Sequence, residues 1–212
     1  FRRDGDTFKP EDVVVPPYLP DIPECRAELA KYYDSVERAD KGLLHLIRIL
    51  KETGRWDNTL VLYLSDNGIA FPGAKTTLYE PGMRLPCVVR NPRAPKHGLV
   101  CNALVNYADI TPTILDLCGA TPDDYEFHGR SFAPILDQQS PDGWDETYAS
   151  HTFHEITMYY PMRVVRGRRY KLIWNIAHGL EYPFASDLYA SDTWQAIRKS
   201  GIDLDELVVV SG

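Results

Sequence analysis

A carboxylate, an amide and a lysine follow one apolar segment closely enough to act on the same ligand. In "LYLSDNGIAFPGAK", Asp66 and Asn67 follow the apolar run 59–64, and Lys75 lies a short loop further on. Carboxylate and amide oxygens are hard donors, which suit Ca²⁺ or Mg²⁺ better than a soft metal. The lysine then brings a mobile cation to any anionic group that such a metal holds. The alternative is a plain turn, because Asp, Asn and Gly dominate turns, and the local sequence alone favours it.

The elements around this stretch are typical of an α/β domain. From residue 21 to Gly54, apolar residues recur at steps of three and four, after the sequence "DIPE", which resembles a capping box. This pattern predicts one long amphipathic helix. The next run, 59–64, is continuously apolar, as in a strand buried on both faces. Ligands of open α/β sheets gather at the carboxyl ends of parallel strands, where Asp66 and Asn67 lie.

Two more elements of the same domain follow. A second buried strand is predicted at 87–90, before the proline-rich turn "NPRAPKHG". Thr111 as N-cap, Pro112 as the first helical residue and Gly119 just after the end predict a short helix over 112–118.

The polar loop 136–147 is the predicted boundary between two parts of the chain. It assigns 1–138 to the α/β domain and 139–212 to a smaller α+β part. Within the second part, "MRVVRGRRYKLIWN" predicts two strands of an antiparallel hairpin around Gly167.

Composition limits the possible partners. The chain has 212 residues and a formal net charge of −7, which argues against nucleic acid and anionic membrane surfaces as partners. No apolar run reaches the roughly 18 residues of a membrane span, so we expect none. The four cysteines, Cys25, Cys87, Cys101 and Cys118, lack zinc-site spacing. We expect buried or partly buried structural thiols, with Cys87 and Cys118 in apolar runs that suit this interpretation.

Four segments in order resemble the second half of a type I sulfatase, a family of the alkaline-phosphatase-like superfamily. They are "DNTLVLYLSDNG", "LYEPGMRLPCVVRNP", "YADITPTILDLCGA" and "FHGRSFAPIL", and the likeness covers roughly residues 25–175. The stretches "GIAFPGAKTTLYEPG" and "HTFHEITMYYPMRVVRGRRYKLIWN" look most like the heparan N-sulfatase (sulfamidase) branch of that family. The resemblance implies an α/β sandwich with a mostly parallel central sheet, followed by the start of a smaller antiparallel carboxyl-terminal subdomain.

The resemblance also implies roles for particular residues. Asp66 and Asn67 would be two ligands of a divalent cation, usually Ca²⁺ with Mg²⁺ possible, and Lys75 would contact a sulfate oxygen. The family's nucleophile is a formylglycine, which attacks sulfur while the metal and nearby cations stabilise the transferring sulfuryl group. The implied substrate is a sulfated amino sugar of the N-sulfoglucosamine type.

The cluster His151, His154 and Glu155 has the order H-x-x-H-E. Zinc metalloproteases use HExxH or HxxEH on a helix, and neither order occurs here. By the resemblance, His154 and Glu155 would line the sugar pocket, with Arg163 a weaker candidate. The alternative is an exposed or structural polar cluster.

The sequence departs from the family pattern in two ways. None of its cysteines begins the C/S-x-P/A-x-R motif in which the formylglycine forms, and the early Asp-Asp pair of the metal site is absent. We therefore expect the chain to be the carboxyl-terminal portion of a longer protein, inactive without the amino-terminal half of the fold.

Other functions stay open at this point. A phosphomonoesterase or phosphodiesterase of the same superfamily would share the fold, although such enzymes usually need more Asp and His ligands. A noncatalytic binding module derived from a sulfatase would explain the absent nucleophile, but not the retained Asp66, Asn67 and Lys75. Because no N-x-S/T acceptor occurs, we expect a bacterial protein, periplasmic, secreted or cytoplasmic, rather than a lysosomal one.

Overall fold

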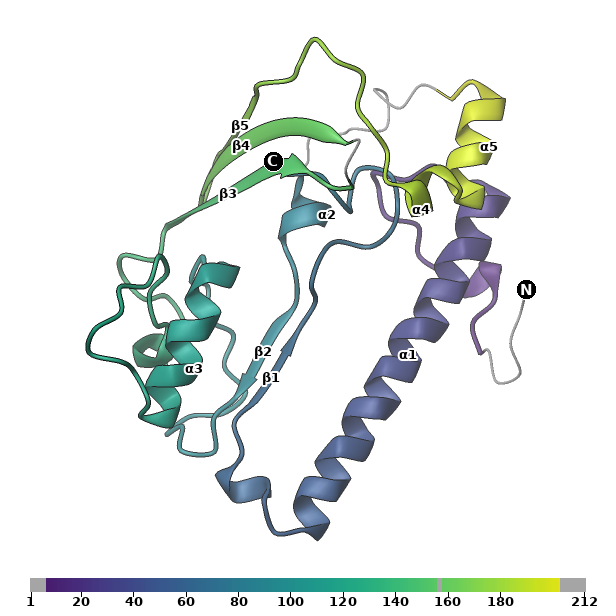
Figure 1. Cartoon of the computed structure of the whole chain (residues 1–212). Coiled ribbons are helices and arrows are strands. Elements are labelled where there is room, and N and C mark those ends of the chain that lie inside the picture. Colours follow the sequence, from purple (N-terminus) through teal and green to yellow (C-terminus); the bar gives the residue numbers. More distant parts are fainter. Residues whose placement is uncertain (1–6, 156–157, 203–212) are drawn as a thin grey trace.

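The computed structural model describes residues 7–155 and 158–202, and it has the expected α/β character (Figure 1). The outer ends of the two predicted domains, 1–6 and 203–212, lie outside the described residues. The helices are α1 (Pro23–Glu52), α2 (Glu80–Met83), α3 (Ile110–Cys118), α4 (Ser186–Tyr189) and α5 (Asp192–Ser200). The strands are β1 (Val61–Leu64), β2 (Cys87–Arg90), β3 (Glu146–Phe153), β4 (Tyr159–Gly167) and β5 (Lys171–Asn175).

The long predicted helix is α1, and its start differs from the prediction. The helix begins after Ile22, which offers no side-chain cap, so the predicted capping box is wrong. Asp21 instead accepts a hydrogen bond of 2.7 Å from Nη2 of Arg26, because a carboxylate binds a guanidinium more strongly than a backbone amide. Beyond the helix end, Gly54 has the left-handed φ of +67° expected of a terminating glycine. Among the described helices, none combines the length and apolarity needed to cross a bilayer.

Strands β1 and β2 pair antiparallel, with Val61 opposite Arg90 and Leu64 opposite Cys87. The expectation of parallel pairing is wrong for these strands, and so is the expectation that they are buried on both faces, since their residues are half-buried or exposed. The connection 65–86 explains why the two strands run antiparallel. It folds back on itself through α2, so the chain enters β2 at the same end of the pair where it left β1.

The carboxyl-terminal part forms a second, three-stranded antiparallel sheet of order β3-β4-β5. The predicted hairpin is confirmed, since β4 and β5 pair from Met162 with Asn175 to Arg166 with Lys171. Strand β3 begins inside the predicted boundary loop 136–147, and the sequence reasoning missed it. One face of the sheet is buried in a cluster that includes Leu78 from the lysine loop region. Its other buried members are Tyr160, Met162, Val164 and Ala177. The boundary between 138 and 139 stays a prediction.

Helix α3 starts two residues earlier than predicted, with Asp109 rather than Thr111 as the N-cap. Asp109 is buried, and its carboxylate accepts hydrogen bonds from the amides of Asn106 (2.9 Å) and Arg130 (2.8 Å). A Cβ on Gly129 would lie 2.2 Å from the carbonyl oxygen of Ala108, so the segment "FHGRS" packs directly on the start of this helix. The predicted end at Gly119 is confirmed by its left-handed φ of +66°.

The cysteines are free thiols that differ in exposure. Cys25 is buried and Cys101 is half-buried, as expected. Cys87 and Cys118 are exposed, so the expectation of buried thiols is wrong for them. Each lies at the end of its element, Cys87 as the first residue of β2 and Cys118 as the last of α3, where apolar neighbours in sequence do not imply a covered side chain.

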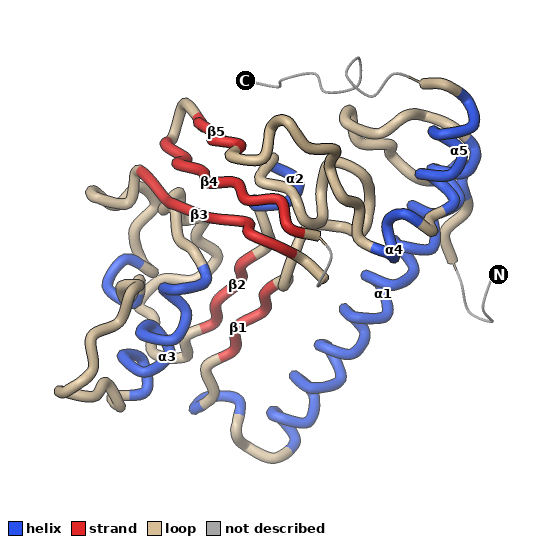
Figure 2. Tube along the Cα trace, turned by 45° about the horizontal axis from the view of Figure 1, so that its top comes forward, coloured by secondary structure: helices blue, strands red, loops and turns tan. Residues whose placement is uncertain are grey.

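The carboxyl-terminal helices return to the amino-terminal end of α1 (Figure 2). Glu28 on α1 accepts hydrogen bonds from the amides of Asp192 (3.0 Å) and Thr193 (2.9 Å), the first residues of α5. A carboxylate at a helix amino terminus satisfies unpaired amides and interacts favourably with the helix dipole. The segment 186–200 is thereby fixed beside the loop that carries Lys75.

Candidate functional site

The strand end places Asp66 and Asn67 at the surface, directly after β1. Oδ1 of Asp66 accepts a hydrogen bond of 2.9 Å from the amide of the next residue, Asn67. Nδ2 of Asn67 donates to the carbonyl of Gly68 at 2.8 Å. The side-chain amide therefore uses its nitrogen locally, and its oxygen is the atom suited to a metal ligand.

Two glycines hold the strand end and the lysine loop against α2. A Cβ on Gly68 would lie 2.3 Å from the carbonyl oxygen of Pro81. A Cβ on Gly82 would lie 2.4 Å from the carbonyl oxygen of Thr77 and 2.5 Å from that of Ala74. Since real Cβ atoms do not approach this closely, both positions require glycine. The motifs "SDNG" and "YEPG" are thus parts of one packed unit.

Lys75 lies in the loop between these glycines, with its amide donating to the carbonyl of Ile69 at 3.1 Å. Its side chain is only 17% exposed, and Nζ lies 2.5 Å from Oδ2 of Asp187 on α4. The hydrogen bond from Lys75 lowers the pKa of Asp187 below its usual range. The sequence predicted the position of Lys75 on the loop, but not this partner.

Glu155 reaches the same short helix from β3. Its Oε1 accepts hydrogen bonds from the amide (3.1 Å) and the hydroxyl (2.8 Å) of Ser186, the residue before Asp187. The hydrogen bond from the backbone amide of Ser186, and after it the hydrogen bond from its hydroxyl, lowers the pKa of Glu155. Glu155 has a left-handed φ of +63°, and His154 beside it is half-buried. Lys75 and Glu155 are therefore brought together through two consecutive residues of α4.

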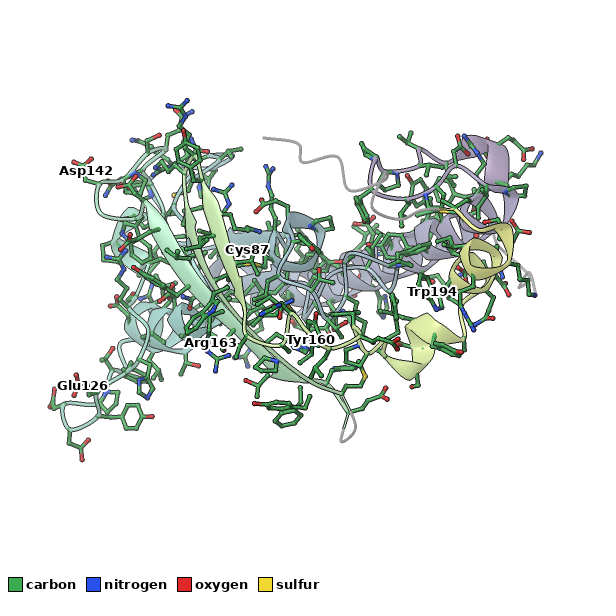
Figure 3. The ribbon with its side chains drawn as sticks, turned by 90° about the horizontal axis from the view of Figure 1, so that it is seen from above. Cys87, Glu126, Asp142, Tyr160, Arg163 and Trp194 are labelled. Carbon is green, nitrogen blue, oxygen red and sulfur yellow. The ribbon has the colours of Figure 1, made fainter. Side chains whose placement is uncertain are left out.

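Arg163 lies elsewhere, on the outward face of β4, where it pairs with Ser150 on one side and Trp174 on the other. Its Nη1 donates to the carbonyls of Met162 (2.9 Å) and His151 (3.4 Å). Figure 3 shows Arg163 on the sheet, away from Trp194 and the α5 end of the molecule. Within the described residues, the hydrogen bonds of Arg163 stay on the sheet and do not reach the loop of Lys75.

The donor set at the strand end fits part of a site for a hard divalent cation. Asp66 offers a carboxylate and Asn67 an amide oxygen, both exposed and adjacent. Within residues 7–155 and 158–202, no group of three or more His, Cys, Asp or Glu side chains gathers to complete such a site. The two residues therefore fit as members of a larger ligand set, and their role stays a prediction.

Sequence reasoning missed Asp187 and Tyr182, which contact Lys75 and Thr76 from the carboxyl-terminal part. Asp187 is separated from Lys75 by 112 positions, and Tyr182 from Thr76 by 106. No local spacing rule connects residues so far apart. The acid within "ASDLY" and the tyrosine within "EYPF" gave no motif by themselves.

Two family descriptions match overlapping parts of the chain. Residues 4–120 match "Sulfatase", and residues 73–188 match "N-sulphoglucosamine sulphohydrolase, C-terminal". The matches meet in 73–120, which contains Lys75, α2 and α3. This overlap agrees with the packing of the lysine loop against the carboxyl-terminal sheet.

Curated relatives are longer than this chain. The N-sulphoglucosamine sulphohydrolase of Homo sapiens is 38% identical over 197 residues, which are 89% of this chain and 39% of the human protein. An N-acetylglucosamine-6-O-sulfatase of Bacteroides thetaiotaomicron is 30% identical over 145 residues, which are 62% of this chain and 25% of that protein. The chain thus spans well under half the length of these relatives.

Solved structures share the fold. One, of a protein in complex with its substrate D-glucosamine-2-N,6-O-disulfate, has a TM-score of 0.58 at 22% identity and covers 87% of this chain and 41% of that one. A phosphonate monoester hydrolase from Silicibacter pomeroyi has a TM-score of 0.54 at 22% identity and covers 91% of this chain and 44% of that one. Since the sulfatase description matches more than half of the sequence, the chain belongs to the sulfatase family.

Proposed function

We propose that the full-length protein is a sulfatase that hydrolyses N-sulfate or sulfate-ester groups on N-sulfoglucosamine-type sugars. The observation that carries the proposal is the packed unit at the end of β1. There, Gly68 and Gly82 press the strand end with Asp66 and Asn67 against the helix that also holds the loop of Lys75. Hard oxygen donors and a cation on one rigid support suit the anionic sulfuryl group of a sulfate ester or N-sulfate.

Each residue of this chain has a distinct part in the proposed reaction. Asp66 and Asn67 supply two oxygen ligands to Ca²⁺, with Mg²⁺ the alternative, and a bound metal would polarise a sulfuryl oxygen. The Lys75 ammonium neutralises negative charge on another sulfuryl oxygen. The nucleophile, a formylglycine, would come from a part of the protein outside this chain.

The sugar side of the site is proposed to involve the carboxyl-terminal part. His154 and Glu155 lie where β3 approaches α4, next to the partner of Lys75. We assign them to substrate recognition, with Arg163 as a more remote member because it lies further along the sheet. The likeness to the human N-sulphoglucosamine sulphohydrolase supports an amino sugar as substrate.

A phosphomonoesterase or phosphodiesterase is the second candidate. The fold shared with the phosphonate monoester hydrolase favours it, as far as fold alone can. An amide ligand and a lysine instead of further Asp and His ligands favour the sulfatase. A noncatalytic module would retain the fold without binding metal at Asp66 and Asn67.

The relatives are longer than this chain, and the part of them that this chain does not span is a candidate to cover one of its apolar surfaces. A groove of about 670 Å³ lies between α1 and the β1–β2 pair, lined mostly by aromatic and aliphatic side chains, among them Tyr32, Val36, Leu43, Tyr63 and Val88. We propose that the amino-terminal half of the same fold fills it. We also propose a bacterial source, with a periplasmic, secreted or cytoplasmic location.

Metal content and substrate choice of the full-length protein test the proposed function. We expect one equivalent of Ca²⁺ or Mg²⁺, lost in an Asp66→Ala, Asn67→Ala double variant. We also expect release of sulfate from N-sulfoglucosamine. Faster release of phosphate from a phosphate monoester would support the second candidate, and absence of both metal and turnover would support the noncatalytic module.

A further inference from the structure

The residue after Lys75 has an unusual backbone conformation. Thr76 has a φ of +66°, in the left-handed region that a β-branched residue rarely occupies. Such a conformation persists only where neighbouring groups hold it. The structure shows what holds it, because the hydroxyl of Tyr182 donates to the carbonyl of Thr76 at 2.9 Å, and the two side-chain hydroxyl oxygens lie 2.7 Å apart.

Tyr182 is itself rigidly supported. Its ring makes edge contacts with Tyr160 on β4 (centroids 5.1 Å apart) and with Phe184 (5.3 Å). Phe184 continues the row to Trp194 on α5, with centroids 4.1 Å apart. A tyrosine hydroxyl keeps its proton and remains a donor at neutral pH, and burial raises the pKa of Tyr182 further above its usual value.

Asp187 holds the other side of the same turn. Its carboxylate pairs with Lys75 at 2.5 Å, and its helix, α4, is held at the amino end by Glu155. Lys75 can rotate about four side-chain bonds, so an unpartnered ammonium would sample many positions. Residues 182–187 thus contact both the backbone after Lys75 and its charged head.

We propose that this segment, which we call the clamp, positions the Lys75 ammonium for catalysis, with Tyr182 and Asp187 as positioning residues. Tyr182 fixes where the lysine's side chain starts, and Asp187 limits where its ammonium points. The functional part of this inference rests on the proposed role of Lys75. Its structural part does not, so the two can be tested apart.

Amide hydrogen exchange tests the structural part. In Tyr182→Phe, which keeps the ring and removes the hydroxyl, we expect amides within 74–79 to exchange about tenfold faster, because a partly buried hydrogen bond between neutral groups is lost. The matched control is Tyr189→Phe, whose hydroxyl accepts a hydrogen bond of 2.7 Å from Arg198 on α5. Unchanged exchange in Tyr182→Phe would overturn the clamp whatever the activity.

Kinetics of the full-length enzyme test the functional part. We expect Asp187→Asn to lower kcat/KM about tenfold, as for one charge-assisted hydrogen bond, and to lower it less than about twofold when Lys75→Ala is already present. The matched control is Asp192→Asn, which changes a carboxylate 3.7 Å from Lys31 and should leave kcat/KM unchanged in both backgrounds.

The outcomes separate the two proposals. Equal losses for Asp187→Asn in both backgrounds would overturn positioning through Lys75 while leaving the sulfatase proposal intact. Near-normal activity of Lys75→Ala would overturn the role of Lys75 and with it the functional part of the clamp. Faster loop exchange together with coupled kinetic losses would support the clamp.

Discussion

At the scale of single residues, Lys75 shows how a mostly covered ammonium group is held by pairing with a carboxylate. Its side chain is mostly covered, and a covered ammonium is costly unless an acceptor compensates for lost water. Asp187 supplies that acceptor through Oδ2, while its Oδ1 accepts a hydrogen bond of 2.9 Å from the amide of Leu188. An ammonium has three donors, so the pair leaves two for the sulfuryl group of the proposed reaction.

Removal of the Lys75 ammonium should slow turnover in the full-length enzyme. Lys75→Ala should lower kcat/KM by roughly a hundredfold, as expected when one preorganised charge contact of about 3 kcal/mol is lost from a transition state. Lys75→Arg should retain part of the activity, because it keeps the charge and changes the geometry. Steady-state kinetics measure both, with thermal melts as a control for folding. Near wild-type activity in Lys75→Ala would remove this lysine from the site.

The candidate site residues that a local pattern predicts are neighbours in the chain, and their role in a site stays a prediction. Asp66, Asn67 and Lys75 belong to one strand–loop unit, so a local pattern identifies them. Asp187 and Tyr182 join the same loop through tertiary packing of the second sheet. Side-chain contacts across more than 100 positions depend on the whole fold and have no local sequence signature.

At the scale of elements, helix α2 organises the loop because its glycine permits close backbone approach. In Gly82→Ala, the new Cβ would overlap two carbonyl oxygens, at 2.4 and 2.5 Å. We expect the free energy of unfolding to fall by about 1–3 kcal/mol, the usual cost of overpacking. Denaturant unfolding measures it in the full-length protein.

The matched control for this change is Gly42→Ala, another glycine within a helix. A Cβ on Gly42 would meet nothing within 4 Å. Alanine has the higher helix propensity, so stability should rise by about 0.5–1 kcal/mol. Equal effects of the two substitutions would show that helix propensity, rather than backbone approach, decides the outcome at Gly82.

Acid should release the contact between α4 and the lysine loop. The pKa of Asp187 is lowered by Lys75, so its contribution to stability is present above the usual carboxyl range and is lost as pH falls through the lowered value. We expect Asp187→Asn to be less stable than wild type at pH 7 by no more than about 1 kcal/mol, since the pair is partly exposed. The difference should begin to shrink below about pH 4, the usual carboxyl pKa, and should vanish only at a pH below the lowered pKa of Asp187, where wild type also loses the charge. A difference that is equally large at both pH values would argue against this ion pair as its source.

Element types were predictable where apolar periodicity is long or turn residues are distinctive. Helix α1 and the β4–β5 hairpin are of this kind. Strand direction was not, because "DNTLVLYL" and "PCVVR" would read the same in parallel and antiparallel pairs. The deciding feature is the fold-back of 65–86 onto α2, which depends on two glycine contacts between distant segments.

At the scale of the whole molecule, an apolar groove is lined by side chains of both α1 and the β1–β2 pair. An α/β layer normally buries the apolar face of its helices on a sheet. Here a part of that face, including Val36 at 44% exposure, stays open in this chain. The motifs of the sequence predicted the family. No motif in it indicates that the surface between α1 and the β1–β2 pair is an open apolar groove.

A charge introduced into the groove should therefore act differently in the chain alone and in the full-length protein. In this chain, Val36→Asp changes a partly exposed side chain and should alter the free energy of unfolding by less than about 0.5 kcal/mol. In the full-length protein, the same carboxylate would be buried without a partner, and the loss should exceed about 2 kcal/mol. The control is Ser35→Asp, which adds the same charge one position away at an exposed site of α1. It should change the free energy of unfolding little in the chain alone and in the full-length protein. Denaturant unfolding of the four variant proteins gives the comparison. A Val36→Asp effect as small in the full-length protein as in the chain would mean that the groove stays open to water and that the amino-terminal half packs elsewhere.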